Sequence, residues 1–214
     1  MNRYVVSLEI SGPTAMWTRP DTGDAPVSYP APTYSAAKGI FESIVWLKNA
    51  EVVPTKAEIC SPLVFHTYST NYGGPLRKSK IMKTASSYQL LATVLINVCY
   101  RLHAVVQDDE VPAARLSDAA KQQQAVAKNG AQAYQAIFQR RLHRGQWHHV
   151  PCLGWKEFVP NYVGPFREDT DVCTDISTVI PSMLRKTFAD GKFSEYRPTF
   201  RQNVKIEKGV LEYA

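Results

Sequence analysis

The sequence has few of the features that would assign it to a common enzyme or membrane class. Its four cysteines stand far apart without a Cys-x-x-Cys pair, which indicates neither a disulfide framework nor a thiolate zinc site. Its longest apolar stretch, residues 90–98, contains polar residues and is too short to cross a bilayer. We expect buried thiols in a reducing cytosol, no membrane contact, and a soluble cytoplasmic protein whose first strand at residue 3 excludes a targeting peptide.

Sequence motifs for nucleotide, hydrolase and zinc-protease chemistry are also missing. There is no Gly-x-x-x-x-Gly-Lys-Ser/Thr loop, Gly-x-Gly-x-x-Gly turn, Gly-x-Ser-x-Gly elbow or His-Glu-x-x-His helix. The adjacent His148 and His149 would point to opposite faces of a strand, so they are poorly arranged to bind one metal. The sequence therefore predicts no metal site and no cofactor.

The chain has a composition typical of a folded, moderately basic protein. Its 214 residues are 44% hydrophobic, which is enough for a packed core in one large domain or a domain with a small appendage. Lys and Arg exceed Asp and Glu by a formal charge of +6. This excess permits nucleic-acid binding but does not require it.

Hydrophobic periodicity and turn residues predict strands interspersed with two helical regions. Strands are expected at 3–10, at 51–65 with interruptions at Pro54 and Pro62, at 90–106, at 153–158, and in hairpins at 181–188 and 194–213 around Asp190-Gly191 and Lys208-Gly209. A long loop is expected at 13–32. Helices are expected from Thr33 or Ser35 to Leu47 and over 113–144, with a break near Asn129-Gly130 and with Ala133, Ala136, Ile137 and, as a further candidate, Tyr134 buried.

This order of elements predicts an α+β fold. We expect a ferredoxin-like (RRM-like) antiparallel sheet with helices in residues 1–150, and a small C-terminal antiparallel β-sheet in residues 151–214.

Cations and flat rings are concentrated in residues 139–158. The stretch contains Arg140, Arg141, His143 and Arg144 at a predicted helix end, then Gly145, Trp147, His148, His149, Trp155 and Lys156. Such a mixture suits RNA, because Arg binds phosphates bidentately and unstacked bases lie on aromatic or guanidinium planes. The alternative is a helix C-terminus that carries Arg to complement its dipole, followed by a half-buried strand.

Two further regions hold candidate RNA contacts. A basic arm at about 66–84 contains Arg77, Lys78, Lys80 and Lys83, and it is either a solvated loop or an arm that wraps a phosphate backbone. Tyr29, in the long loop, is a candidate for a contact with a base. A metal-free ribonuclease would need a base, an acid and a cation, and Tyr134, His143 and His149 are the candidates for proton transfer.

Several segments together resemble the Cas-five family of CRISPR-associated proteins, in its subtype I-C form, within the repeat-associated RNA-binding (RAMP) superfamily. These segments are 28–34, 38–44, 138–141 with Gly145-Gln146, 153–158 and 208–211, and they occur in the same order along nearly the whole chain. The resemblance implies a ferredoxin-like RNA-binding protein that caps the 5′ handle of the guide RNA in the Cascade complex for antiviral defence. The implied partners are guide RNA, the backbone and large subunits of Cascade, and target DNA within the complex.

Subtype I-C members of this family also cut precursor RNA without a metal, using a Tyr on the first helix and a Lys-His pair on the later one. The matching positions here are Val45, Ala133 and Tyr134. Valine and alanine transfer no protons, so we expect a guide-RNA-binding subunit. The alternatives are a metal-independent endoribonuclease that uses rearranged residues, and a small basic RNA-binding protein unrelated to CRISPR.

Overall fold

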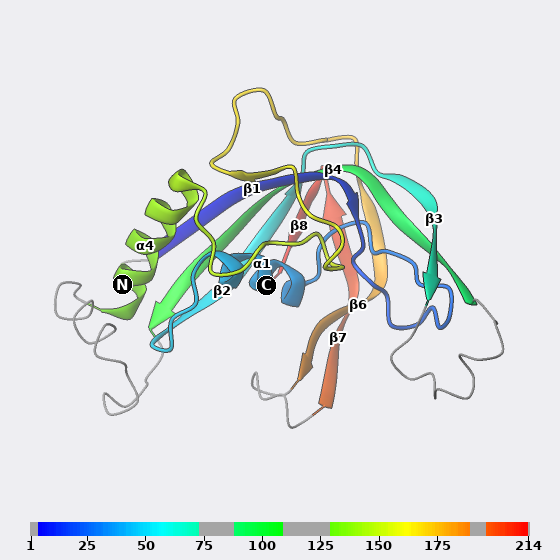
Figure 1. Ribbon diagram of the computed structural model, residues 1–214, viewed down its shortest axis with the longest axis horizontal. Coiled ribbons are helices and arrows are strands. Elements are labelled where there is room, and N and C mark those ends of the chain that lie inside the picture. The colour runs from blue at the N-terminus through cyan, green and yellow to red at the C-terminus, as the bar shows by residue number, and fades with distance from the viewer. Residues whose placement is uncertain (1–3, 73–87, 109–128, 189–195, 214) are drawn as a thin grey trace.

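The computed structural model describes residues 4–72, 88–108, 129–188 and 196–213. The elements in chain order are β1 (Tyr4–Ala15), α1 (Tyr34–Ile44), β2 (Ala50–Ile59), β3 (Val64–Tyr72), β4 (Tyr88–Asp108), α4 (Gly130–Arg144), β5 (Tyr162–Gly164), β6 (Thr178–Phe188), β7 (Tyr196–Glu207) and β8 (Val210–Glu212). The strands form one sheet in the order β5-β1-β4-β2-β8-β7-β6, with β3 on β4, and all pairings between them are antiparallel. The fold is therefore a mixed one, with an antiparallel sheet and two helices among the described residues (Figure 1).

Strand β4 is the longest strand of this sheet and pairs with three others. It is 21 residues long and pairs with β1 and β2 along its second half and with β3 along its first half. Asn97, with a φ of 53°, lies between the β3-paired and β2-paired parts, and Asn tolerates this left-handed conformation better than most residues. The strand predicted at 90–106 is confirmed, and the alternate residues Val98, Tyr100 and Leu102 of its second half are buried.

Both described helices begin at capping residues, and α4 ends at a glycine. Thr33 caps α1 by accepting a hydrogen bond from Ala36 N, and Asn129 caps α4 by accepting one from Gln132 N. Gly145 ends α4 in the left-handed conformation, with a φ of 61°. The two helices meet through Phe41 and Phe138, whose ring centroids are 5.7 Å apart. Neither helix is long and apolar enough to span a membrane.

The predicted strand at 153–158 is wrong. This segment is a closed turn, in which Leu153 N donates to Phe158 O and Phe158 N donates to Trp155 O. Gly154 has a φ of 94°, and a Cβ at this position would lie 1.8 Å from Met16 O, so the turn packs its backbone directly on the end of β1. The strand on this side of β1 is instead β5.

Several other boundaries differ from the prediction. Strand β1 continues to Ala15 and α1 stops at Ile44, while Ala136, predicted to be buried, is exposed. Pro54 lies inside β2 at a shift in the pairing with β4, consistent with the expected bend. The helical prediction for 113–128 and the turn at Asp190-Gly191 lie outside the described residues.

The C-terminal strands continue the same sheet. Strand β8 pairs with β2 and, through a turn at Lys208-Gly209, with β7. Both turn residues have positive φ, 49° and 76°, as the predicted hairpin turn requires.

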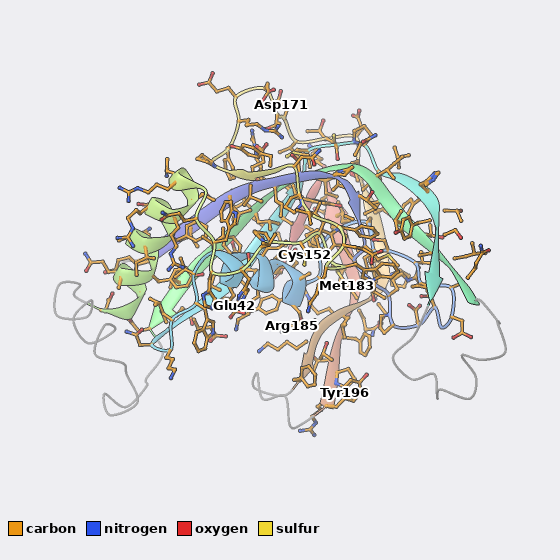
Figure 2. The ribbon with its side chains drawn as sticks, viewed as in Figure 1. Glu42, Cys152, Asp171, Met183, Arg185 and Tyr196 are labelled. Carbon is orange, nitrogen blue, oxygen red and sulfur yellow. The ribbon has the colours of Figure 1, made fainter. Side chains whose placement is uncertain are left out.

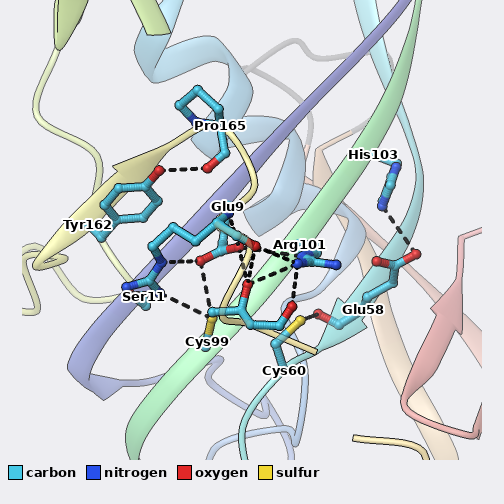
Figure 3. Close-up of polar contacts among 11 residues, drawn as sticks. Glu9, Ser11, Glu58, Cys60, Cys99, Arg101, His103, Tyr162 and Pro165 are labelled. Atoms are coloured by element: carbon cyan, nitrogen blue, oxygen red, sulfur yellow. Dashed lines mark hydrogen bonds and ion pairs between the residues drawn. The ribbon is translucent and has the colours of Figure 1, made fainter. Parts of the chain in front are cut away.

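A buried carboxylate fastens the segment after β5 to the sheet (Figure 3). Glu9 alternates with Leu8 and Ile10, which belong to the core, so its side chain lies on the other face. Glu9 Oε1 accepts a hydrogen bond from Arg167 Nε at 2.6 Å, and Oε2 accepts one from Thr170 Oγ1 at 2.7 Å. Burial alone would raise the pKa of Glu9, but the hydrogen bonds from Thr170 and Arg167 outweigh it and hold the pKa below 4.5.

This arrangement predicts a contribution of Glu9 to acid stability. The pKa of Glu9 is lower in the folded protein than in the unfolded chain, where it is near 4.5. The ionised carboxylate therefore stabilises the fold fully above pH 4.5, and this stabilisation is lost as the pH falls through the pKa of the folded state. Glu9→Gln should lower the free energy of unfolding at neutral pH by about 1–3 kcal/mol and flatten its decline below pH 4.5. Urea unfolding at several pH values measures both effects, with the exposed Asp24→Asn as control. If the free energy of unfolding of Glu9→Gln declined below pH 4.5 as steeply as that of the wild type, the ionised Glu9 carboxylate would not be a source of acid-dependent stability.

Candidate nucleic-acid interface

The C-terminal end of α1 is held by the segment that ends and follows α4. His148 N and His149 N both donate to Ser43 O, at 2.8 and 2.9 Å. Arg141 Nη1 donates to Ile44 O at 2.7 Å. The last carbonyls of a helix have no partner within the helix, so these donors complete the end of α1 and fix the 141–149 segment against it.

A groove of about 690 Å³ lies between α1 and the 149–156 segment. Its lining residues are Trp17, Ala36, Gly39, Ile40, Ser43, His149, Val150, Cys152, Gly154 and Lys156. The segment crosses α1 in Figure 1, and Figure 2 shows Cys152 beside this helix. Trp17 and Ile40 are buried and apolar, whereas His149 and Lys156 are exposed and carry nitrogen donors. The volume and this mixture of groups are typical of a ligand site.

Gly39 leaves an open position on the groove side of α1. It is exposed, and a Cβ built there would meet no described atom within 4 Å. Glycine in a helix is about 1 kcal/mol less favourable than alanine, so packing among the described residues gives no reason for it. Close approach of a ligand to the helix backbone would give such a reason.

The predicted RNA-binding residues of the 139–158 stretch differ in accessibility. Those with exposed side chains are Arg140, Arg144, His148 and Lys156. Trp147 and Trp155 are half-buried, and Trp155 stacks on Phe158 at 5.6 Å between ring centroids while its Nε1 donates to Thr18 Oγ1. Arg141 is half-buried and already bonded to α1. Of the exposed donors, Lys156 lines the groove, whereas Arg140 and Arg144 lie on α4.

The structure supports no RNA contact for Tyr29, and the cations of the predicted basic arm lie outside the residues that it describes. Tyr29 is 2% exposed, and its hydroxyl accepts a hydrogen bond from Leu184 N. This burial leaves no open ring face for a base, so Tyr29 is not retained as a base contact. The cations of the basic arm, Arg77, Lys78, Lys80 and Lys83, lie outside the described residues.

The positions that match the family's cleavage residues are buried. Val45, Ala133 and Tyr134 are 1%, 7% and 1% exposed. Tyr134 Oη donates to Phe41 O, and burial raises the pKa of its phenol, so this residue can neither reach RNA on the surface nor act as a base near neutral pH. Its candidacy for catalysis is therefore withdrawn.

His148 and His149 do not lie on a strand. His148 and His149 were expected on opposite faces, but their segment is irregular, and their ring centroids are 4.3 Å apart. Both backbone N–H groups bind the carbonyl of Ser43, and the two rings lie next to each other. His149 lines the groove, whereas His143 is exposed on α4 with its Nδ1 2.8 Å from Gln139 O.

Sequence reasoning missed the groove itself. Trp17, Gly39 and Cys152 come from three separate segments, and only the glycine within a helical pattern was a local signal. The described residues thus define a class of protein: an antiparallel sheet with two helices, one of which borders a groove lined in part by the exposed Lys156 and His149.

The chain belongs to the family described as CRISPR-associated protein (Cas_Cas5), whose model matches residues 5–203. A relative from Thermus thermophilus, named CRISPR pre-crRNA endoribonuclease Cas5d, is 28% identical over 161 residues, which cover 75% of this chain and 63% of that protein. The chain thus spans less than two thirds of the length of this relative.

Solved structures share the fold at low sequence identity. One described as a CRISPR-associated protein has a TM-score of 0.67 at 17% identity, with 100% of this chain and 94% of that chain covered. A chain of a CRISPR RNA-guided surveillance complex has a TM-score of 0.50 at 14% identity, with 98% and 91% covered.

Proposed function

We propose that the protein is a subunit of a type I CRISPR Cascade effector complex that binds and caps the 5′ handle of the guide RNA in antiviral defence. Membership of the CRISPR-associated family supports this role, as does the fold shared with a chain of an RNA-guided surveillance complex. The proposed partners are guide RNA, the backbone and large subunits of Cascade, and target DNA within the complex.

The observation that carries RNA binding is the groove beside α1 with its exposed cations. Lys156 and His149 line it, and Arg140 and Arg144 are exposed near the C-terminal end of α4, from which the chain leads into the 149–156 wall of the groove. Phosphates would bind to these cations, while the apolar wall and the open position at Gly39 accommodate a sugar or base against α1. Family membership and groove chemistry thus favour the same ligand.

We further propose that β1, α1, β2, β4, α4 and β5 form a ferredoxin-like unit. The strand order β5-β1-β4-β2, with α1 before β2 and α4 before β5, supports this assignment. Strands β6, β7 and β8 would then be the small C-terminal β-sheet unit. The division at residue 150 stays a prediction, and the pairing of β5 with β1 favours a boundary after Gly164.

RNA binding should depend on salt and on the end of α4. Arg140→Ala combined with Arg144→Ala should weaken binding of single-stranded repeat RNA, because each lost phosphate contact removes about 0.7 from the slope of log affinity against log salt concentration. We expect a slope that is smaller by about 1.4 and a lower affinity at every salt concentration, measured by fluorescence anisotropy.

The matched control is Lys48→Ala, an exposed cation beside Asn49, which contacts the opposite end of α4 at Gly130. It should leave the slope unchanged. Arg141→Ala serves to separate structure from binding, since loss of its bond to Ile44 O should destabilise the fold by about 1–3 kcal/mol. RNA affinity and slope that are unaffected in the double variant would overturn the proposed interface.

The second candidate function is a metal-independent endoribonuclease with rearranged residues. The name of the Thermus thermophilus relative favours this activity, and His149 and Lys156 share one groove, where they supply an imidazole and a cation. The buried Val45, Ala133 and Tyr134 argue against the mechanism that the family resemblance implies. We therefore rank cleavage second.

A cleavage assay separates the two functions. The unmodified protein, incubated with a complete repeat hairpin and a chelator, should leave the RNA intact, because the surface holds no full set of acid, base and cation at the family's positions. Products are resolved on a denaturing gel. Cutting at a single site that His149→Ala abolishes and Lys48→Ala does not would reverse the ranking and identify a rearranged active site.

A further inference from the structure

The β6–β7 hairpin forms a ribbon that extends beyond the rest of the sheet (Figure 1). Only Ile206 and Glu207 of β7 pair with β8, while the pairing with β6 continues as far as Tyr196. In the outer half of β6, Ser35 Oγ donates to Arg185 O, and the Arg185 guanidinium lies 5.4 Å from the centroid of the Tyr34 ring. The ribbon is therefore anchored at the N-terminal end of α1.

Cations and exposed rings are combined on this ribbon. Tyr196 and Phe200 are 72% and 43% exposed, and Figure 2 shows Tyr196 at the far end of the described ribbon. Its described strands carry the cations Arg185, Lys186, Arg197, Arg201 and Lys205, against the single carboxylate of Glu207. A surface with this excess of positive charge is complementary to a polyanion.

The backbone of the ribbon disfavours a partner strand as the ligand. Pro181 and Pro198 lack the N–H groups that strand addition would use, and the β6–β7 register shifts twice, between Leu184 and Lys186 and between Lys186 and Phe188. Prolines, irregular pairing and exposed cations are devices that protect sheet edges from other strands. The Tyr196 ring meets Phe188 edge-on at 6.3 Å between ring centroids, and its exposure, like that of Phe200, leaves ring surface on which a base can stack.

We propose that the β6–β7 ribbon binds single-stranded nucleic acid, with bases stacked on Tyr196 and Phe200 and phosphates on the neighbouring Arg and Lys side chains. Stacking rings beside cations are the usual means of holding a single strand without reading its sequence. This surface is separate from the groove and goes beyond binding of the RNA handle. The groove lies beside α1, and the ribbon is anchored at the N-terminal end of the same helix.

The test uses the full chain and fluorescence anisotropy with single-stranded RNA and single-stranded DNA of the same sequence. Tyr196→Ala and Phe200→Ala should each weaken binding about tenfold, the loss typical of one stacked base. Tyr196→Phe should retain wild-type affinity because it keeps the ring, whereas Tyr196→Leu, which keeps only apolar bulk, should lose it. Val179→Ala, an exposed apolar change elsewhere on β6, is the control, and thermal unfolding verifies that each variant is folded.

The outcomes separate this proposal from the proposed function. A greater loss for RNA identifies the guide strand as the ligand, and a greater loss for DNA identifies the target strand. Equal binding by wild type, Tyr196→Ala and Phe200→Ala overturns the ribbon site even where Arg140 and Arg144 remain necessary for RNA. Full affinity of Tyr196→Leu overturns stacking. If the wild type did not bind RNA, the proposed function would be overturned. The affinities of wild type, Tyr196→Ala and Phe200→Ala for single-stranded DNA would then still test the ribbon site.

Discussion

The hydrogen bonds that complete the end of α1 couple the fold to the candidate site. The carbonyls of Ser43 and Ile44 lie where a helix has no partners of its own, and they accept bonds from His148 N, His149 N and the Arg141 guanidinium. Leaving such buried carbonyls unpaired is costly, so the 141–149 segment has little freedom to move. The same segment leads into one wall of the groove, whose shape therefore follows from the need to cap a helix.

Features that depend on local sequence could be predicted, because the responsible residues are neighbours in the chain. The strand at 90–106, the start of α1 at Thr33, the helix boundary near Asn129-Gly130 and the turn at Lys208-Gly209 are of this kind. The 153–158 segment was mistaken for a strand because its apolar spacing suits one. Its turn is determined by a contact with Met16, more than a hundred residues away, and no local pattern indicates such a contact.

The candidate site was predictable as a composition but not as a geometry. Arg140, Arg141 and Arg144 are equivalent in the sequence, yet the structure leaves the first and last exposed and uses Arg141 to bind α1. Tyr29 was a plausible base contact in a long loop until the structure showed its ring inside the core. A groove built from segments distant in sequence requires knowledge of how they pack, which helical and strand periodicity does not contain.

The most direct test of the account is RNA affinity after Gly39→Leu. This substitution adds a side chain at a groove-lining position where no described atom lies within 4 Å of a Cβ, and it removes the helix cost of glycine, about 1 kcal/mol. The variant should unfold at the same or a higher denaturant concentration but bind guide RNA at least about tenfold more weakly than Gly39→Ala. Equal affinities of Gly39→Leu and Gly39→Ala would contradict the claim that RNA occupies the groove beside α1.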